Sequence, residues 1–490
     1  MLGSAAPAVG SALMRAFTSS SAAAAAVPAL ASKSGSSTGL ASMFGFGSSR
    51  IDTPLSEPLP TSVVPLRSTL PVVAPKLQSG ALEAGTKLMA IDSVSPVSSV
   101  ALVFEGGSAF ESPELAGAGR VLENMAYKAT ANRTTFRLTR ELEKIGAIAT
   151  CSAGRDHIAY TVSAVKLHAP EIVEALLDAT LNPKLNYHEV AEAVAATKAS
   201  LAAALRDPTT LITDVLHRAA FDGSLGQPLN VDPQLLDGFN NNMLKEYVAS
   251  VLNPSTAVLA AAGVGLDEFQ QLANPLVSSE RVSGSTATSS STYVGGALNL
   301  VANTSPLAYV ALAFEAKGGL SDPKSAAAAA VVKALLDESR SMLPHASKDH
   351  SVLKSATAFA HLYKGTGLVG LVASSAPAQA AQLADAVVKK IENVAKGVPE
   401  AQLKQAKRLA ISAYKATLAS STGLVGVLGQ QLLLTGQFNP AEFPAAVEAL
   451  TSADVSSFVS KALKSAPTYV TYGSLSAARV PRYDVIAKRF

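Results

Sequence analysis

The sequence predicts an α+β protein of two homologous lobes, each a mostly antiparallel sheet covered by helices. The first observation is a repeat: the strand-like hexapeptide 100–105 (VALVFE) recurs at 310–315 (VALAFE), and a glycine pair follows each copy. The second is the order of elements after each copy, which is helices, a strand pair, helices and a closing strand. Helices in runs favour an α+β layer with helices on one sheet face over a doubly wound parallel sheet.

In the first copy, hydrophobic periodicity and turn residues set the expected elements. The expected helices are 114–129, 134–145, 170–181, 188–205, 212–220 and 241–252. A strand pair is expected over 147–163, turning at 154–156, and the strand 257–263 closes the unit.

The second copy repeats this order with the same kinds of pattern. The expected helices are 324–342, 377–395, 400–416, 424–434 and 452–463. The expected strands are the pair 355–361 and 367–373 and the closing strand 468–473.

The two copies are joined by a polar, Ser/Thr-rich segment that is typical of a linker. We therefore expect five parts in the chain. These are a presequence (1–50), an N-terminal extension (51–74), a first lobe (75–277), a linker (278–295) and a second lobe (296–490). The lobes either enclose a cavity or set two flat sheets face to face.

The composition excludes several classes of protein. The 490 residues are 48% hydrophobic and 16% charged, which allows a sizeable core. The formal net charge of +3 gives no basic excess of the nucleic-acid-binding kind, and a single cysteine, Cys151, excludes a disulfide framework. We expect no membrane span, because no stretch of about 18 strongly apolar residues occurs.

The first fifty residues differ in composition from the rest of the chain. They contain no Asp or Glu, twelve Ser, and only Arg15, Lys33 and Arg50 as charged residues. This composition is typical of an organelle transit peptide, and Arg15-Ala16-Phe17 before Thr18-Ser19 favours the mitochondrion. Without these three cations, 37 basic residues balance 37 acidic ones, so the basic excess belongs to the targeting segment.

Residues 117–130 (GAGRVLENMAYKAT) resemble the zinc-helix segment of the M16 (pitrilysin-type) metallopeptidases, which is His-x-x-Glu-His followed by Met-Ala-Phe-Lys-Gly-Thr in active members. Within this family, 132–134 (NRT) and 293–296 (YVGG) are similar to plant-type alpha subunits of the mitochondrial processing enzyme. The resemblance spans about residues 75–490. It implies the two-lobed M16 duplication.

The resemblance places Arg120 and Asn124 at the two histidine positions and Glu123 at the general base. A guanidinium has no lone pair for a metal and repels a dication, and Asn is a poor zinc ligand. The family's third ligand is a Glu about 75 residues further on, yet residues 194–204 contain no carboxylate. We therefore expect no catalytic residues, no bound metal and no cofactor.

A receptor for basic presequences needs clustered carboxylates. Glu105, Glu111 and Glu114 are the candidate contacts, the alternative being an ordinary solvated face. Alpha subunits of this family also have a glycine-rich loop in the second lobe, which is thought to contact the presequence. No glycine occurs here between Gly319 and Gly365, so the resemblance implies presequence binding less strongly.

The function that the resemblance implies first is a non-catalytic core 2 subunit of the mitochondrial bc1 complex (ubiquinol–cytochrome c reductase). Its place would be peripheral, on the matrix side of the inner membrane. Its partners would be a beta-type M16 homologue (core 1) and other bc1 subunits. The alternative is the presequence-recognising alpha subunit that serves a zinc-bearing beta subunit.

Overall fold

The computed structural model describes residues 76–93, 95–277, 291–302, 305–337, 353–474 and 480–489. The expected presequence and extension, and most of the expected linker, lie outside these residues. The place of the family's glycine-rich loop, 338–352, also lies outside them.

The first sheet has six strands in the order β1-β2-β7-β3-β5-β4. Only β2 and β7 pair in parallel, and all other neighbours are antiparallel. The strands are β1 Lys76–Ala81, β2 Lys87–Asp92, β3 Val97–Glu105, β4 Ile148–Ala153, β5 His157–Val165 and β7 Val258–Ala262.

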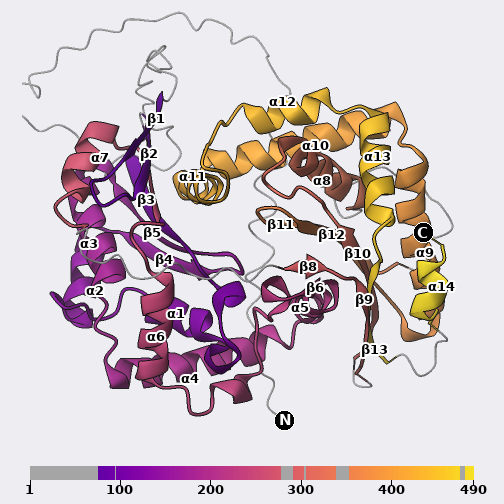
Figure 1. Ribbon diagram of the computed structural model, residues 1–490, viewed down its shortest axis with the longest axis horizontal. Helices are drawn as coiled ribbons and strands as arrows, with labels where there is room; N and C mark the ends of the chain where they lie inside the picture. Colours follow the sequence, from indigo (N-terminus) through magenta and orange to yellow (C-terminus); the bar gives the residue numbers. More distant parts are fainter. Residues whose placement is uncertain are drawn as a thin grey trace, which may run out of the picture. The chain divides into compact units, whose positions relative to one another are not determined.

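Seven helices belong to the described part of this first lobe (Figure 1). They are α1 Ala118–Met125, α2 Thr135–Lys144, α3 Ala169–Leu181, α4 Tyr187–Ala204, α5 Pro208–Ala220, α6 Asn241–Val251 and α7 Leu266–Ala273. The apolar faces of most of them share one core with the sheet.

The second sheet repeats the first with one strand fewer, in the order β11-β12-β10-β13-β9. Here β9 and β13 are the parallel pair, as β2 and β7 are in lobe 1. The strands are β9 Gly296–Val301, β10 Ala308–Glu315, β11 Ser355–Leu362, β12 Gly367–Ser375 and β13 Thr468–Gly473.

A short antiparallel ribbon pairs β6 (Phe221–Asp222) of lobe 1 with β8 (Thr292–Tyr293), which lies just before lobe 2. The helices of lobe 2 follow the same plan as those of lobe 1. They are α8 Pro323–Leu336, α9 Ala380–Lys396, α10 Glu400–Ala419, α11 Ser421–Thr435, α12 Glu442–Ala449, α13 Ser452–Leu463 and α14 Tyr483–Ala487.

Each sheet is covered on both faces. Helices of its own lobe cover one face, and a helix of the other lobe covers the opposite face. Along β3, Leu102 and Phe104 face the helices of lobe 1, whereas Ala101 and Val103 pack against α11 of lobe 2. Likewise, β10 turns alternate residues towards α5 of lobe 1. This arrangement explains why the first five residues of both repeated hexapeptides are all apolar instead of alternating with polar residues.

The predicted α+β class with two homologous lobes is confirmed. One detail differs, because the sequence suggested helices on a single face of each sheet. The expected helix 114–129 is also shorter: Pro113–Leu115 forms a 3₁₀ turn, and Gly117 has a left-handed φ of 87° just before α1 begins. Several short elements were not expected, namely β1, β2, β9, α7, α12 and α14.

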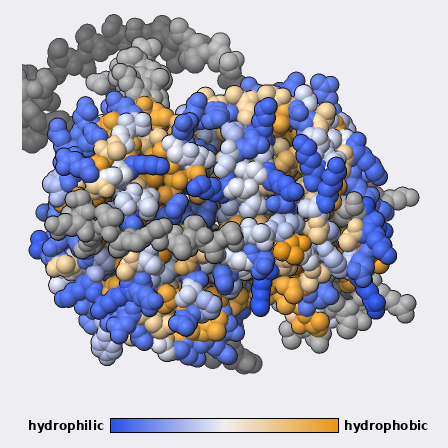
Figure 2. Space-filling model, in the orientation of Figure 1, coloured by the Kyte–Doolittle hydropathy of each residue, from blue (hydrophilic) through white to orange (hydrophobic). Residues whose placement is uncertain are grey.

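In the described part of the chain, no single helix is long and apolar enough to span a membrane. The helices α10 and α11 together reach that length and composition, but they bend by 106° between them. Figure 2 shows a largely hydrophilic face with smaller hydrophobic patches between the polar residues.

Candidate functional site

The degenerate motif lies on α1, whose N-terminus is held by a carboxylate. Glu111 accepts hydrogen bonds from the backbone N–H of Gly117 (2.7 Å) and of Gly119 (2.8 Å). These are donors that a helix start leaves without an intrahelical acceptor. Val121, Leu122 and the rest of the apolar face are buried, so the polar residues of the motif project from the opposite side.

Arg120 and Glu123 form an ion pair on α1, while Nε of Arg120 is buried and has no hydrogen-bond partner among the described residues. The guanidinium lies 2.7 Å from the Glu123 carboxylate, and Arg120 also donates to Oδ1 of Asn230 at 3.1 Å. Glu123, at the position of the family's general base, is thus engaged in an i,i+3 ion pair on α1.

Asn124 reaches across to the long helix α4. Its side-chain amide donates to Oγ1 of Thr197 (2.9 Å), and the Thr197 hydroxyl donates to the carbonyl of Ala193 (2.7 Å). Thr197 follows Asn124 by 73 residues and is fully buried. No sequence pattern singled out Thr197, although the expected spacing of about 75 residues pointed to this part of the helix.

The resulting set of groups has the wrong chemistry for zinc. An arginine, an amide and a hydroxyl occupy the α1–α4 contact, and neutral imidazole, thiolate or carboxylate ligands are what zinc binds. The carboxylates of α4 are Glu189 and Glu192, both in its first turns, and Glu189 accepts hydrogen bonds from Thr135 and Asn186 instead. Among the described residues, no group of three His, Cys, Asp or Glu side chains could hold a metal ion.

A series of hydrogen bonds and one ion pair connects the motif to the junction of the lobes. Asn230 donates from its backbone (3.0 Å) and its side chain (2.6 Å) to Asp214 on α5. Asp214 forms a buried ion pair with Arg155, which lies in the turn between β4 and β5. Arg120, Asn230, Asp214 and Arg155 thus connect α1 to the helix that covers the second sheet.

The three candidate presequence contacts lie on one segment but in different environments. Glu105 ends β3 and is half-buried, Glu114 is exposed, and Glu111 is turned inward to α1. Burial raises the pKa of Glu111 to about 6, opposed by the two backbone N–H groups and by Arg120. Among the three, the exposed Glu114 is the best placed to meet a basic peptide.

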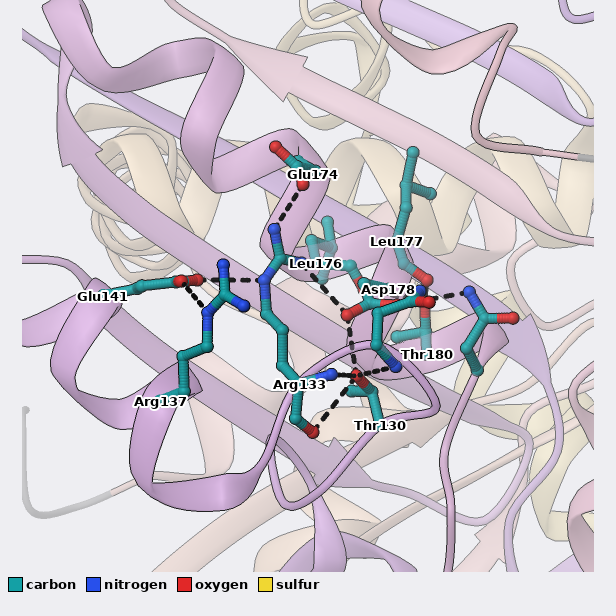
Figure 3. A network of polar contacts seen from close by, with 11 residues as sticks. Thr130, Arg133, Arg137, Glu141, Glu174, Leu176, Leu177, Asp178 and Thr180 are labelled. Atoms are coloured by element: carbon teal, nitrogen blue, oxygen red, sulfur yellow. Dashed lines mark hydrogen bonds and ion pairs between the residues drawn. The ribbon is translucent and has the colours of Figure 1, made fainter.

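The NRT segment is a structural anchor (Figure 3). The guanidinium of Arg133 pairs with Asp178 (3.0 Å), Glu141 (2.9 Å) and Glu174. Thr130 also donates to Asp178, at 2.8 Å. This network fastens α2 and the loop before it to α3, which explains an arginine at this place without assigning it a ligand.

Lobe 2 contains a groove of about 1220 Å³ between the start of α8 and helices α12 and α13. Phe438, Phe458 and several alanines supply apolar lining, and Glu442 and Lys461 are among its charged residues. The mixture suits a peptide side chain, but no single charge dominates the lining.

Two family descriptions match the chain in sequence. Residues 88–232 match the family described as insulinase (peptidase family M16), and residues 238–410 match the peptidase M16 inactive domain.

Among its relatives, the chain is 32% identical to the mitochondrial-processing peptidase subunit alpha of Solanum tuberosum, over 90% of this chain and 88% of the relative. It is 32% identical to a probable mitochondrial-processing peptidase subunit alpha-1 of Arabidopsis thaliana, over 94% of both chains. It is 24% identical to the cytochrome b-c1 complex subunit 2 of Rattus norvegicus, over 83% of this chain and 92% of the relative.

These similarities confirm the expected resemblance. They also change the order of the two expected functions, because the relatives with higher identity are processing-peptidase alpha subunits and not bc1 subunits.

Proposed function

Because the chain belongs to the M16 peptidase family, we propose that it is the non-catalytic alpha-type subunit of a mitochondrial processing peptidase. It binds basic presequences for a zinc-bearing beta-type partner. The main observation is the α1–α4 contact, where Arg120, Asn124 and Thr197 are hydrogen-bonded in place of metal ligands. The relatives at 32% identity support the same role.

A second candidate function is core subunit 2 of the bc1 complex, on the matrix side of the inner membrane. The similarity to the rat bc1 subunit supports it. The two functions are compatible if one assembly both scaffolds the respiratory complex and processes presequences. In either case the acid-free residues 1–50 act as the mitochondrial address.

The proposed organisation follows the duplication. Residues 1–50 are the presequence and 51–74 an extension; lobe 1 spans 75–277, the linker 278–295 and lobe 2 296–490. The degenerate positions Arg120, Glu123 and Asn124 hold α1 against α4 and the segment around Asn230. Glu114 contacts the presequence, together with Glu105, which is near it in sequence.

Reconstitution tests the proposal. The mature chain, the beta-type subunit and a presequence peptide are mixed, and cleavage is followed together with the zinc content of each purified chain. We expect cleavage only with both chains and zinc only in the beta-type chain. Cleavage by the beta-type chain alone at the full rate would contradict the proposal.

Purification of complex III from gently solubilised mitochondria separates the two candidates. Stoichiometric recovery of this chain in the complex supports the bc1 role, and its absence removes that role while leaving the processing role standing.

A further inference from the structure

The strands β2 and β9 occupy the same position in their sheets. The Lys87 N–H donates to the carbonyl of Ala257 just before β7 (3.3 Å), and the Gly296 N–H donates to the carbonyl of Pro467 just before β13 (3.2 Å). Each strand therefore begins its parallel pairing in the same way.

The peptide groups of a strand face its two edges alternately. Gly296 and Ala302 both donate towards β13, so the amides of Ala297, Asn299 and Val301 face the opposite, outer edge of β9. In the described part of the chain, none of these three amides has a hydrogen-bond acceptor and no strand pairs with that edge.

Lobe 1 shows how the same edge can be covered. There the strand β1 lies antiparallel on β2, with Gly80 opposite Leu88, Gln78 opposite Ala90 and Lys76 opposite Asp92. By the same alternation, Leu88, Ala90 and Asp92 are the outward residues of β2. Among the residues that the structure describes, the second sheet has the strand order of the first sheet without a counterpart of β1.

The bare edge also lacks the usual protection. Edge strands are commonly guarded by lysines, prolines or bulges, because a free row of peptide groups recruits another strand. The sequence of β9, GALNLV, contains no charged residue and no proline. The side chains of Leu298 and Val301 are 38% and 67% exposed.

We propose that the outer edge of β9 receives an additional antiparallel strand from the beta-type partner chain, an inference that rests on the proposed function. The added segment is extended, about six residues long and uncharged towards β9. It takes the place that β1 takes in lobe 1.

The neutral composition points to a permanent partner. A charged ligand would find no counter-charge on β9, and an uncharged edge left bare invites aggregation. Among the similar proteins, several are named as subunits of larger enzymes, so an unlike chain is favoured as the source of the strand over a second copy.

Hydrogen–deuterium exchange of the peptide 295–302 tests the proposal on the full mature chain, alone and in complex with the beta-type subunit. In the free chain the amides of Ala297, Asn299 and Val301 should exchange fast, and in the complex they should slow by more than about tenfold. A complex that forms while β9 exchanges as in the free chain overturns the inference but leaves the proposed function intact. If the two wild-type chains do not associate at all, the proposed function fails as well.

The double variant A297P/V301P removes two outward amides and no amide that faces β13. We expect its affinity for the partner to fall by about tenfold or more, with a thermal midpoint close to that of the matched control A297S/V301T. Equal affinity of the two variants overturns the inference. Two further outcomes overturn the inference, because the added strand then comes from this chain. One is protection of β9 in the free monomer that is lost when 51–74 is deleted. The other is protection that arises through self-association.

Discussion

Two helices cover the sheet of the opposite lobe, and they do so by different chemistry. The contact of α11 with the first sheet is apolar: Val425 and Leu428 are fully buried there, and Gly429 approaches so closely that a Cβ would lie 2.5 Å from Val103. The contact of α5 with the second sheet adds polar groups. His217 is hydrogen-bonded to the hydroxyl of Tyr363 (2.9 Å). Asp214, on the same helix, belongs to the hydrogen-bonded series that leads to Arg120 in the degenerate motif.

In both lobes a helix of the other lobe packs on the sheet, but among the described residues only the contact of α5 includes buried hydrogen-bonded side chains. Apolar packing tolerates small shifts. The hydrogen bond of Tyr363 with His217 fixes α5 against lobe 2, and the buried ion pair of Asp214 with Arg155 fixes α5 to the β4–β5 turn of its own lobe. Both are costly when a partner is lost. We therefore expect α5 to be the more sensitive junction.

The largest effect is expected from Asp214→Ala. It leaves the buried guanidinium of Arg155 unpaired and removes the acceptor of two Asn230 donors, which should lower the free energy of unfolding by about 3–5 kcal/mol. Denaturant unfolding measures the loss. The same substitution in an Arg155→Ala background should cost much less, and equal costs in both backgrounds would contradict the ion pair.

Leu428→Ala tests the apolar junction. The side chain is fully buried against the first sheet, so its truncation should cost about 3 kcal/mol. The exposed Thr422→Ala on the same helix is the control, with an expected change below about 0.5 kcal/mol. A loss at Leu428 no larger than at Thr422 would show that α11 does not hold the first sheet.

Tyr363→Phe should cost about 1–2 kcal/mol. His217 Nδ1 donates to the carbonyl of Thr213, so in the neutral ring Nε2 accepts from Tyr363 and loses its donor in the variant. Tyr309→Phe is the matched control, because no hydrogen bond of its hydroxyl is found in the described part of the chain. Equal effects of the two substitutions on unfolding would remove the proposed hydrogen bond.

The smallest effect is the pH dependence of stability that His361 contributes beside α5. Burial, with the charges of Arg155 and Lys333, lowers the pKa of His361 to about 4, although Asp214 acts against it. The unfolded chain protonates this histidine at a higher pH than the folded chain does. The contribution of His361 to stability is therefore complete above pH 6.5 and is lost as the pH falls towards 4. Between pH 7 and pH 6 the loss should be below about 1 kcal/mol.

His361→Gln should reduce this loss, as measured by unfolding at several pH values. Glu111 acts in the opposite direction, since its raised pKa makes stability fall as the pH rises from 4.5 to about 6. The comparison is therefore between the variant and the wild type at each pH. Identical slopes in both would contradict a neutral, half-buried His361 with a lowered pKa.

The sequence was informative where side chains act locally. The repeat of VALVFE as VALAFE predicts β3 and β10, and local periodicity predicts most of the helices and strands. The residue types Arg120 and Asn124 alone indicate the altered motif. It was less informative at edges: β1, β2 and β9 are short, and their pairing depends on strands far along the chain. Glu111 was expected at a surface, and its use by the backbone of α1 depends on the turn at Gly117.

The sequence by itself determined the duplication, the α+β class and the lack of imidazole at the motif positions Arg120 and Asn124, because each follows from residue identity, from local periodicity or from a repeat of the same residues. Only the tertiary structure decided which helix covers which sheet, that Thr197 meets Asn124, and that no strand of the described residues pairs with the outer edge of β9, whereas β1 pairs with β2. These features depend on contacts between distant segments, and the free energy of such contacts is not recorded in any local pattern.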